Sequence, residues 1–213
     1  MPIPILTELT QPTVGLIILA AGSSSRMGSP KQLLTFKGVS LVRHAALTAL
    51  GSGCNPVIVV LGASMELIRP EVEDLSLHIL GNPDWEEGLG SSIRTGINYL
   101  LQTVPHISAA LLMLCDQPML SSSLIRQLVN EFQTSSAPVI TSEYGNQWGV
   151  PALFGRELFG ELLNLKGPSG AKNVIQKFAA KGRSVAFPKG LLDVDTPEDY
   201  QRLQAGDLDQ TPD

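Results

Sequence analysis

Several features are scarce in this 213-residue sequence, and each absence narrows the function. There are two cysteines, Cys54 and Cys115, without C-x-x-C spacing. A disulfide framework or cysteine-based metal site is therefore not indicated, and we expect both to be small buried apolar side chains. Lys and Arg number 15 against 20 Asp and Glu, giving a net charge of -5. No basic stripe is present, which argues against a nucleic-acid-binding surface but leaves room for a local phosphate pocket.

Long apolar segments are also missing. No apolar run approaches the ~18 residues of a membrane span, and residues 1–13 lack the basic segment and apolar core of a secretory signal. We therefore expect a cytoplasmic protein without a membrane partner. With 43% hydrophobic and 16% charged residues, the composition is that of a globular protein. The length suits one sizeable core, so we expect a single domain over residues 14–204, with flexible termini at 1–13 and 205–213.

Apolar runs alternate with helical patterns along the chain. Most of the runs are continuous, as in strands buried on both faces of a sheet. The predicted strands are Val14–Ala20, Val57–Leu61, Leu77–Leu80, Ala109–Cys115, Pro138–Thr141 and Ser184–Phe187. Helices are predicted to begin near Ser40, Ser64, Ser91 and Ser121, the second of them ending at about Asp74. Further helices are predicted at 156–165, 170–181 and 197–204, with a turn-rich stretch at 145–151. This order predicts a three-layer α/β/α, Rossmann-like fold with a mainly parallel sheet, whose ligands sit beyond the carboxyl ends of the strands.

The loop that follows the first predicted strand is the main candidate for a phosphate site. It is rich in small residues and carries two cations, Arg26 and Lys31. Its glycines do not match the G-x-x-x-x-G-K-S/T spacing of a P-loop. The nearest dinucleotide fingerprint, at Gly88–Ile93, has Ile93 where the third glycine should stand. The loop is therefore either a phosphate-binding loop of another kind or an ordinary connection.

Acidic residues follow two other segments. Asp116 comes directly after an apolar run, where a carboxylate can hold Mg²⁺ or simply cap a turn. In the segment DVDTPEDY (193–200), Thr196 has the features of a helix N-cap. Asp193 and Asp195 precede it, and the sequence leaves open which of them faces a site. In residues 82–96, small residues open a helix that can receive a base edge or an anion, although Ser91 also suits ordinary capping.

Together these segments resemble the MobA-like nucleotidyltransferases, and most closely the MocA-type molybdenum cofactor cytidylyltransferases. The resemblance spans Val14 to about Gln204. It is carried by LAAGSSSRMGSPK (19–31), NPDWEEGLGSSIRTG (82–96), CDQP (115–118), GVPALF (149–154), GPSGAK (167–172) and DVDTPEDY (193–200). It implies a fold of the nucleotide-diphospho-sugar transferase type. It also implies transfer of CMP from CTP to a molybdopterin-type molybdenum cofactor, with release of pyrophosphate, assisted by Mg²⁺ or alternatively Mn²⁺.

The resemblance also assigns roles to residues. Leu19, Ala20, Ala21 and Gly22 would wrap the nucleotide, with Arg26 and Lys31 on its phosphates. Asp116 and Asp195 would bind the metal, and Gly62, Asn82, Ser91 and Ser92 would contact base or ribose. The Ala20-Ala21-Gly22 sequence favours the cytidylyl type over guanylyl-transferring relatives, which typically have Ala-Gly-Gly. One departure is Pro168-Ser169, where relatives usually carry an acidic residue on the acceptor side.

Alternative functions remain at this stage. One is transfer of GMP to the same cofactor, and another is nucleotidyl transfer to a sugar phosphate. A third is a nucleotide-binding accessory protein that delivers finished cofactor to a molybdenum hydroxylase apoenzyme. No covalent nucleophile is apparent, and His44, His78 and His106 lack a partner pattern, so we interpret all three histidines as structural.

Overall fold

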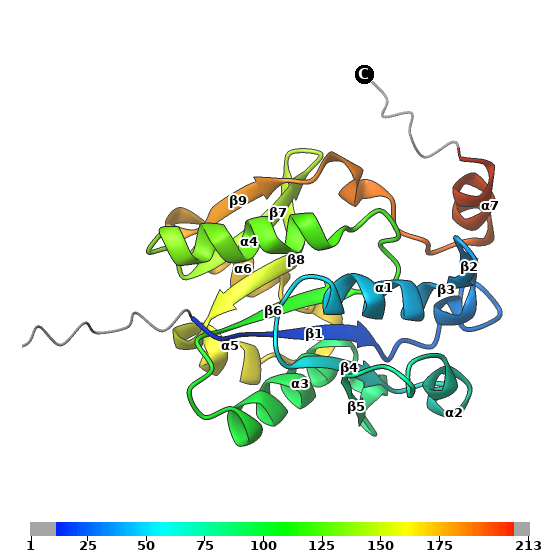
Figure 1. Cartoon of the computed structure of the whole chain (residues 1–213), viewed down its shortest axis with the longest axis horizontal. Coiled ribbons are helices and arrows are strands. Elements are labelled where there is room, and N and C mark those ends of the chain that lie inside the picture. Colours follow the sequence, from blue (N-terminus) through cyan, green and yellow to red (C-terminus); the bar gives the residue numbers. More distant parts are fainter. Residues whose placement is uncertain (1–11, 207–213) are drawn as a thin grey trace, which may run out of the picture.

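The computed structural model describes residues 12–206, so most of the two predicted flexible termini lies outside the described residues. A seven-stranded sheet has the order β5-β4-β1-β6-β8-β7-β9 (Figure 1). Its strands are β1 Val14–Ala20, β4 Val57–Leu61, β5 His78–Gly81, β6 Ala109–Leu114, β7 Val139–Tyr144, β8 Gln147–Gly155 and β9 Arg183–Ala186. A separate hairpin joins β2 Thr35–Phe36 to β3 Val39–Ser40. The predicted α/β class with a mainly parallel mixed sheet is confirmed.

The central strands form where the apolar runs predicted them. Every residue of β1 and of β4 is buried, because helices cover both faces of the sheet there. β1 pairs in parallel with β4 and with β6, so the carboxyl ends of these three strands lie at one edge. Ligand-binding loops of such sheets gather at this edge.

One strand of the seven-stranded sheet was not predicted, and neither was the short β2–β3 hairpin. β8 runs antiparallel to β6 and to β7, whereas the other pairs of the sheet are parallel. The stretch 145–151 was predicted to be rich in turns, which holds for Gly145 and Asn146 but is wrong from Gln147, where β8 begins. Gly149 and Pro151 hide the strand pattern in the sequence, because both residue types are unfavourable in strand interiors. In addition, only the second half of β8 is buried.

Helices connect the strands. They are α1 Leu41–Leu50, α2 Met65–Ile68, α3 Leu89–Thr103, α4 Ser122–Thr134, α5 Phe159–Leu163, α6 Lys172–Phe178 and α7 Pro197–Ala205. The side chains of Ser40, Ser121 and Thr196 cap α1, α4 and α7 as predicted. The helix predicted from Ser64 to about Asp74 is wrong in its extent. Ser64 makes no capping hydrogen bond, α2 has four residues, and Pro70 lies in the 3-10 turn that follows.

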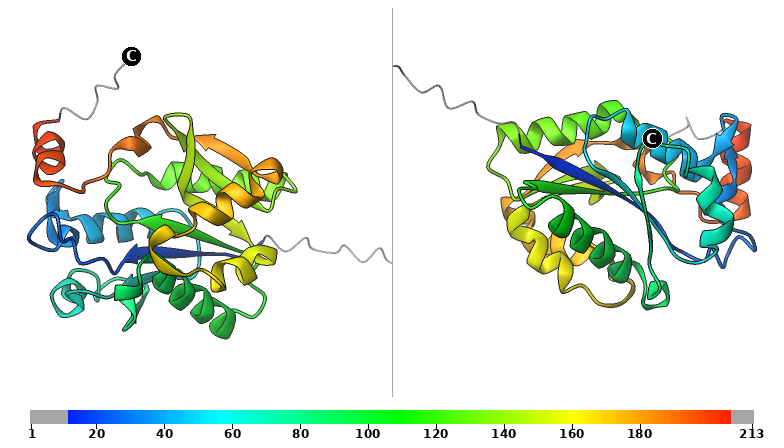
Figure 2. Two further views of the ribbon diagram at one scale, coloured as in Figure 1. Left: turned by 180° about the vertical axis from the view of Figure 1, so that it is seen from behind. Right: turned by 60° about the horizontal axis from the view of Figure 1, so that its bottom comes forward.

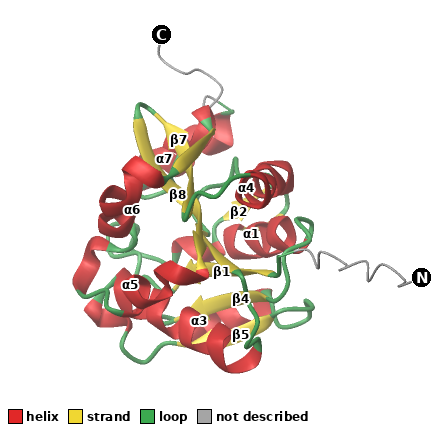
Figure 3. Cartoon of the chain, turned by 90° about the vertical axis from the view of Figure 1, so that its left-hand side faces the viewer, coloured by secondary structure: helices red, strands yellow, loops and turns green. Residues whose placement is uncertain are grey.

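Two hydrophobic cores lie between the sheet and the helices, one on each face of the sheet. α1 and α4 pack on one face of the sheet, and α3, α5 and α6 on the other (Figures 2 and 3). A third, small cluster joins Leu41, Val194 and Leu203. It attaches α7 beside the β2–β3 hairpin, so the segment before α7 crosses the carboxyl edge of the sheet.

Both cysteines are free, with Cys115 buried and Cys54 half-buried. Within residues 12–206, no helix combines the length and the apolar character needed to cross a bilayer.

Candidate active site

Lys31 is the centre of a cluster of charges at the carboxyl edge of the sheet. Its Nζ atom lies 2.5 Å from Asp116 Oδ2 and 2.6 Å from Asp195 Oδ1. Its side chain is only 16% exposed. Burial opposes a charged ammonium group, but the negative charges of Asp116 and Asp195 outweigh it, so the pKa of Lys31 is raised. Lys31 is therefore a permanent cation between two carboxylates.

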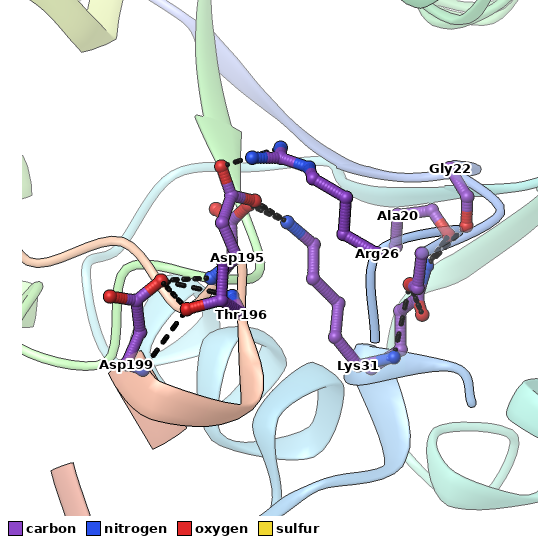
Figure 4. A network of polar contacts seen from close by, with 10 residues as sticks. Ala20, Gly22, Arg26, Lys31, Asp195, Thr196 and Asp199 are labelled. Atoms are coloured by element: carbon purple, nitrogen blue, oxygen red, sulfur yellow. Dashed lines mark hydrogen bonds and ion pairs between the residues drawn. The ribbon is translucent and has the colours of Figure 1, made fainter. Parts of the chain in front are cut away.

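Arg26 adds a second cation from the same loop. Its guanidinium group donates to Asp195 Oδ2 at 2.9 Å, and its side chain is 67% exposed (Figure 4). Such an exposed pair contributes little to stability. The pKa of Asp195 is nevertheless lowered, because its partial desolvation is outweighed by the hydrogen bond and charge of Lys31 and by the charge of Arg26. The exposed Arg26 side chain can exchange Asp195 for a phosphate at little cost.

Asp116 offers an oxygen that nothing in the described chain uses. Oδ1 is buried and has no hydrogen-bond partner there, although Oδ2 accepts from Lys31. Carboxylate oxygens are the ligands that Mg²⁺ and Mn²⁺ prefer, so this orphaned atom fits a divalent cation. Among the described residues no three His, Cys, Asp or Glu side chains gather into a metal cage. The donor set thus suits a metal that takes one or two carboxylates and completes its shell with water and phosphates.

Asp193 is the third carboxylate near this centre. Desolvation, reinforced by the charges of Asp116 and Asp195, raises its pKa to about 6. Between the two aspartates, Val194 is buried and its N–H donates to the carbonyl oxygen of Asp116 at 3.0 Å. Val194 points into the small cluster, so Asp193 and Asp195 both face the site. Of these two aspartates, Asp195 is the one that forms ion pairs with Lys31 and Arg26.

A cavity of about 280 Å³ opens beside the charged cluster. Most of its wall comes from the residues that sequence reasoning selected. The predicted residues that line it are Leu19, Ala20, Ala21, Gly22, Lys31, Ser92 and Asp116. Gln32, Trp85, Gly88, Leu89, Leu114 and Cys115 complete the wall. Arg26 and Asp195 lie outside this lining and reach the cavity through their contacts with each other and with Lys31.

Three predicted residues lie behind the cavity wall. Asn82 is buried, and its amide donates to Ser91 Oγ at 2.8 Å and to Ser92 Oγ at 3.0 Å. Gly62 permits a close approach, because a Cβ there would lie 2.6 Å from the Cβ of Trp85. The structure therefore gives Asn82, Ser91 and Gly62 positions that support Trp85 and the start of α3.

Of the six wall residues that were not predicted as site residues, two have side chains that shape the cavity. Gln32 is 1% exposed, and its amide donates to the carbonyl oxygens of Ala20 at 3.1 Å and Gly22 at 2.8 Å. It shapes the loop from within, and its only sequence signal is its position next to Lys31. Trp85 lines the cavity, and it stands inside a segment that was selected for its small residues.

The histidines have structural surroundings. His44 Nε2 lies 3.0 Å from the carbonyl oxygen of Pro118, and His78 Nδ1 lies 2.9 Å from the hydroxyl of Tyr99. Burial lowers the pKa of His44. These contacts support the structural interpretation of both residues.

A mainly parallel sheet with this cation–carboxylate centre at its carboxyl edge defines an α/β protein of the nucleotide-diphospho-sugar transferase fold. The chain belongs to the MobA-like NTP transferase domain family, whose model matches residues 16–184.

Relatives and solved structures agree with this family. The chain is 39% identical over 119 residues to nicotine blue oxidoreductase of Paenarthrobacter nicotinovorans, covering 55% of this chain and 56% of that protein. It is 30% identical to purine catabolism protein PucB of Bacillus subtilis (strain 168), covering 88% and 94%. The crystal structure of Rv0371c from Mycobacterium tuberculosis H37Rv superposes with a TM-score of 0.80 at 28% identity, covering 92% and 100%. A further structure of Rv0371c, in complex with manganese, has a TM-score of 0.75 at 27% identity, covering 90% and 97%.

Proposed function

We propose that this protein transfers CMP from CTP to a molybdopterin-type molybdenum cofactor and releases pyrophosphate. One observation carries the proposal. Lys31 and Arg26, from the loop after β1, meet Asp116 and Asp195, from distant parts of the sequence, beside a cavity walled by Leu19–Gly22. Two cations and two carboxylates at a glycine-bearing loop suit a nucleoside triphosphate and its metal.

The chemical difficulty of the reaction is charge. An anionic phosphate of the acceptor must attack the α-phosphorus of an anionic triphosphate. A new O–P bond forms, the bond between the α-phosphorus and the bridging oxygen breaks, and pyrophosphate leaves with the electron pair. Positioning and electrostatic stabilisation supply most of the catalysis in such transfers.

Lys31 and Arg26 serve this charge balance differently. Lys31 is mostly buried and permanently charged, so it holds the triphosphate in a fixed orientation close to Asp116. Arg26 is mostly exposed and reaches over the loop, which suits a guanidinium group that pairs with the outer phosphates. Ala21 and Gly22 lie in the same wall.

Asp116 and Asp195 would hold a divalent cation. When bound, Mg²⁺ or Mn²⁺ would neutralise phosphate charge and polarise the reacting oxygens. The orphaned Asp116 Oδ1 supports this assignment, as does the manganese complex of the related Rv0371c. Asp193 enlarges the negative field on the metal side.

A pyrophosphate-release assay tests the proposal. The protein is given CTP, GTP, ATP or UTP, with and without molybdopterin cofactor, in the presence of Mg²⁺ or after chelation. We expect release with CTP and cofactor together, loss on chelation, and recovery with Mg²⁺ or Mn²⁺. A preference for GTP would instead indicate guanylyl transfer. Tight CTP binding without any release would support the accessory role in cofactor delivery to a molybdenum hydroxylase.

Asp116→Asn gives the sharpest variant for this assay. It removes the carboxylate charge but keeps the size of the side chain, so we expect turnover to fall by about 100-fold or more. Asp74→Asn is the matched control, since Asp74 is 58% exposed and paired with Arg43 away from the cavity. Turnover near the wild-type rate in Asp116→Asn would overturn the metal role.

Because one relative bears the name of an oxidoreductase, NADH and NADPH oxidation are followed in the same samples.

A further inference from the structure

Gln32 lies beneath the loop that follows β1. It belongs to the 3-10 turn Lys31–Leu33, directly after the buried cation, and is itself buried. Its amide donates to the carbonyl oxygens of Ala20 and Gly22, and its Oε1 atom accepts from the hydroxyl of Ser24 at 3.1 Å (Figure 4). A glutamine side chain has two N–H donors and one carbonyl oxygen, so each of these groups is used within the loop.

The three carbonyl oxygens of Ala20–Gly22 are all held by hydrogen bonds. Gln32 binds the first and the third, and the second accepts from the N–H of Ala63 at 3.0 Å. The peptide bonds after these carbonyl groups are trans, and the N–H of a trans peptide unit points opposite to its carbonyl oxygen. The N–H groups of Ala21 and Ser23 therefore point away from the Gln32 amide.

This arrangement sets the sign of the charge that the loop favours. A carbonyl oxygen carries partial negative charge and an N–H group carries partial positive charge. A loop whose carbonyl oxygens are turned inward therefore favours an anion on its other side. The same loop carries Arg26 and Lys31, so its backbone and its side chains favour the same sign of charge.

The backbone of Ser24 shows how firmly this loop is held. Its φ of 55° lies in the left-handed region, which residues other than glycine adopt at a cost in energy. The Ser24 hydroxyl accepts from the N–H of Lys31 at 3.0 Å and donates to Gln32, so two hydrogen bonds hold the strained residue in place. Gln32 thus connects the loop to the backbone of the residue that bears the buried cation.

We propose that Gln32 is a positioning residue for the triphosphate. By holding the carbonyl oxygens of Ala20 and Gly22, it keeps the N–H side of the loop turned toward the phosphates, and it acts through the loop backbone. This inference rests on the proposed nucleotidyl transfer, because that reaction places phosphates at the loop.

Gln32→Met tests the proposal, since methionine is a flexible side chain without an amide to bind the two carbonyl oxygens. Isothermal titration with CTP and with inorganic tripolyphosphate, both with Mg²⁺, measures the Kd. We expect the Kd of both probes to rise by about tenfold, as for the loss of two ordinary hydrogen bonds. The KM for CTP should rise with it, whereas the KM for the molybdopterin cofactor should stay the same.

Ser52→Ala is the matched control. Ser52 is also buried, and its hydroxyl donates to the carbonyl oxygen of Ala49 and accepts from the N–H of Cys54. This loop precedes β4 and lies at the opposite edge of the sheet, so both Kd values should equal those of the wild type. A rise in Ser52→Ala equal to that in Gln32→Met would overturn the positioning role.

The titrations also separate positioning from a purely structural role. A structural role would lower the melting temperature and the fraction of folded protein, which reduces the binding stoichiometry but leaves the Kd of the folded fraction unchanged. That result in Gln32→Met would overturn the proposal.

Ser24→Gly keeps the test decisive if Gln32→Met does not fold. Glycine adopts the left-handed backbone readily, and the change removes the hydroxyl that bonds to Gln32. We expect the Kd of tripolyphosphate to rise by about threefold, and an unchanged Kd would then overturn the role of Gln32. Wild-type binding and pyrophosphate release alongside unchanged variants would leave the nucleotidyl transfer standing. If the wild type binds neither CTP nor tripolyphosphate, the transfer itself fails, and the positioning role fails with it.

Discussion

At the scale of single residues, the site depends on the pairing of buried charges with groups of opposite charge. Lys31 lies within ion-pair distance of Asp116 and Asp195 while its side chain is mostly buried. Removing one partner of such a group leaves the others without compensation, which costs more than losing a surface ion pair.

Lys31→Ala removes the buried cation. We expect the affinity for CTP to fall by about 10- to 100-fold, because a desolvated charge-assisted contact to phosphate is lost. Isothermal titration with CTP measures the change, and Lys37→Ala serves as the control, since Lys37 is an exposed lysine that contacts the ring of Phe36. Unchanged CTP affinity in Lys31→Ala would contradict the phosphate role.

Asp193 predicts a pH-dependent stability in the metal-free protein. Its pKa is raised from 3.8 to about 6, so the folded state holds a proton that the unfolded state releases between these values. Stability therefore decreases as the pH rises through this window, and the penalty is complete above about pH 6. Asp193→Asn should be more stable than the wild type at pH 7.5 and equally stable near pH 3.5, as measured by urea unfolding with chelator. The same difference at both pH values would contradict the prediction.

At the scale of elements, helix caps and loops position the charged side chains of the site. Asp195 lies one residue before Thr196, the N-cap of α7. The carboxylate of Asp199 accepts hydrogen bonds from the N–H groups of Asp195 at 3.3 Å and Thr196 at 2.9 Å. Thr196 Oγ1 accepts in return from the N–H of Asp199, which completes a capping box (Figure 4). The cap of a helix thus orients a residue of the proposed active site.

Thr196→Ala separates this positioning from general stability. We expect it to cost about 1 kcal/mol of unfolding free energy, the usual value of an N-cap, and also to reduce turnover. Ser121→Ala is the control, because Ser121 caps α4 by the same kind of hydrogen bond away from the cavity. It should lose similar stability and keep its turnover. Equal turnover in the two variants would show that the α7 cap does not position Asp195.

At the scale of the whole molecule, the layers set how the cavity is built. α3 lies against β1 at Gly96, where a Cβ would come within 2.8 Å of Ile17 Cδ1 and Cγ2. The first turn of the same helix supplies Leu89, which lines the cavity. We propose that residues 14–204 form a single domain, which the continuous seven-stranded sheet supports.

Gly96→Ala tests this close packing. The added methyl group must push α3 away from β1, so we expect a loss of about 1–3 kcal/mol and weaker CTP binding. Gly160→Ala is the matched control, since Gly160 lies in α5 with nothing within 4 Å of an added Cβ. It should be neutral or stabilising by up to about 1 kcal/mol. Chemical unfolding of both variants measures the difference, and no loss of stability in Gly96→Ala would contradict the packing argument.

The sequence by itself determined the central strands, three helix caps and the resemblance to the family. Continuous apolar runs such as Val14–Ala20 and Val57–Leu61 have few alternatives to a buried strand. The resemblance to the MobA-like family was confirmed, because its motifs lie in local segments that sequence reasoning can compare. β8 was not predicted because Gly149 and Pro151 are unfavourable in strands. The strand is stabilised by its pairing with β6 and β7.

Only the tertiary structure decided how distant residues meet. Asp195 is separated by 164 residues from Lys31, and no local pattern predicts their contact. The buried Val194, which turns Asp193 and Asp195 to the same side, also depends on the packing of α7. The same holds for Gln32, whose role follows from carbonyl oxygens that only the folded loop brings to it. Local propensity specifies elements, whereas desolvation and charge pairing act between elements and require the assembled fold.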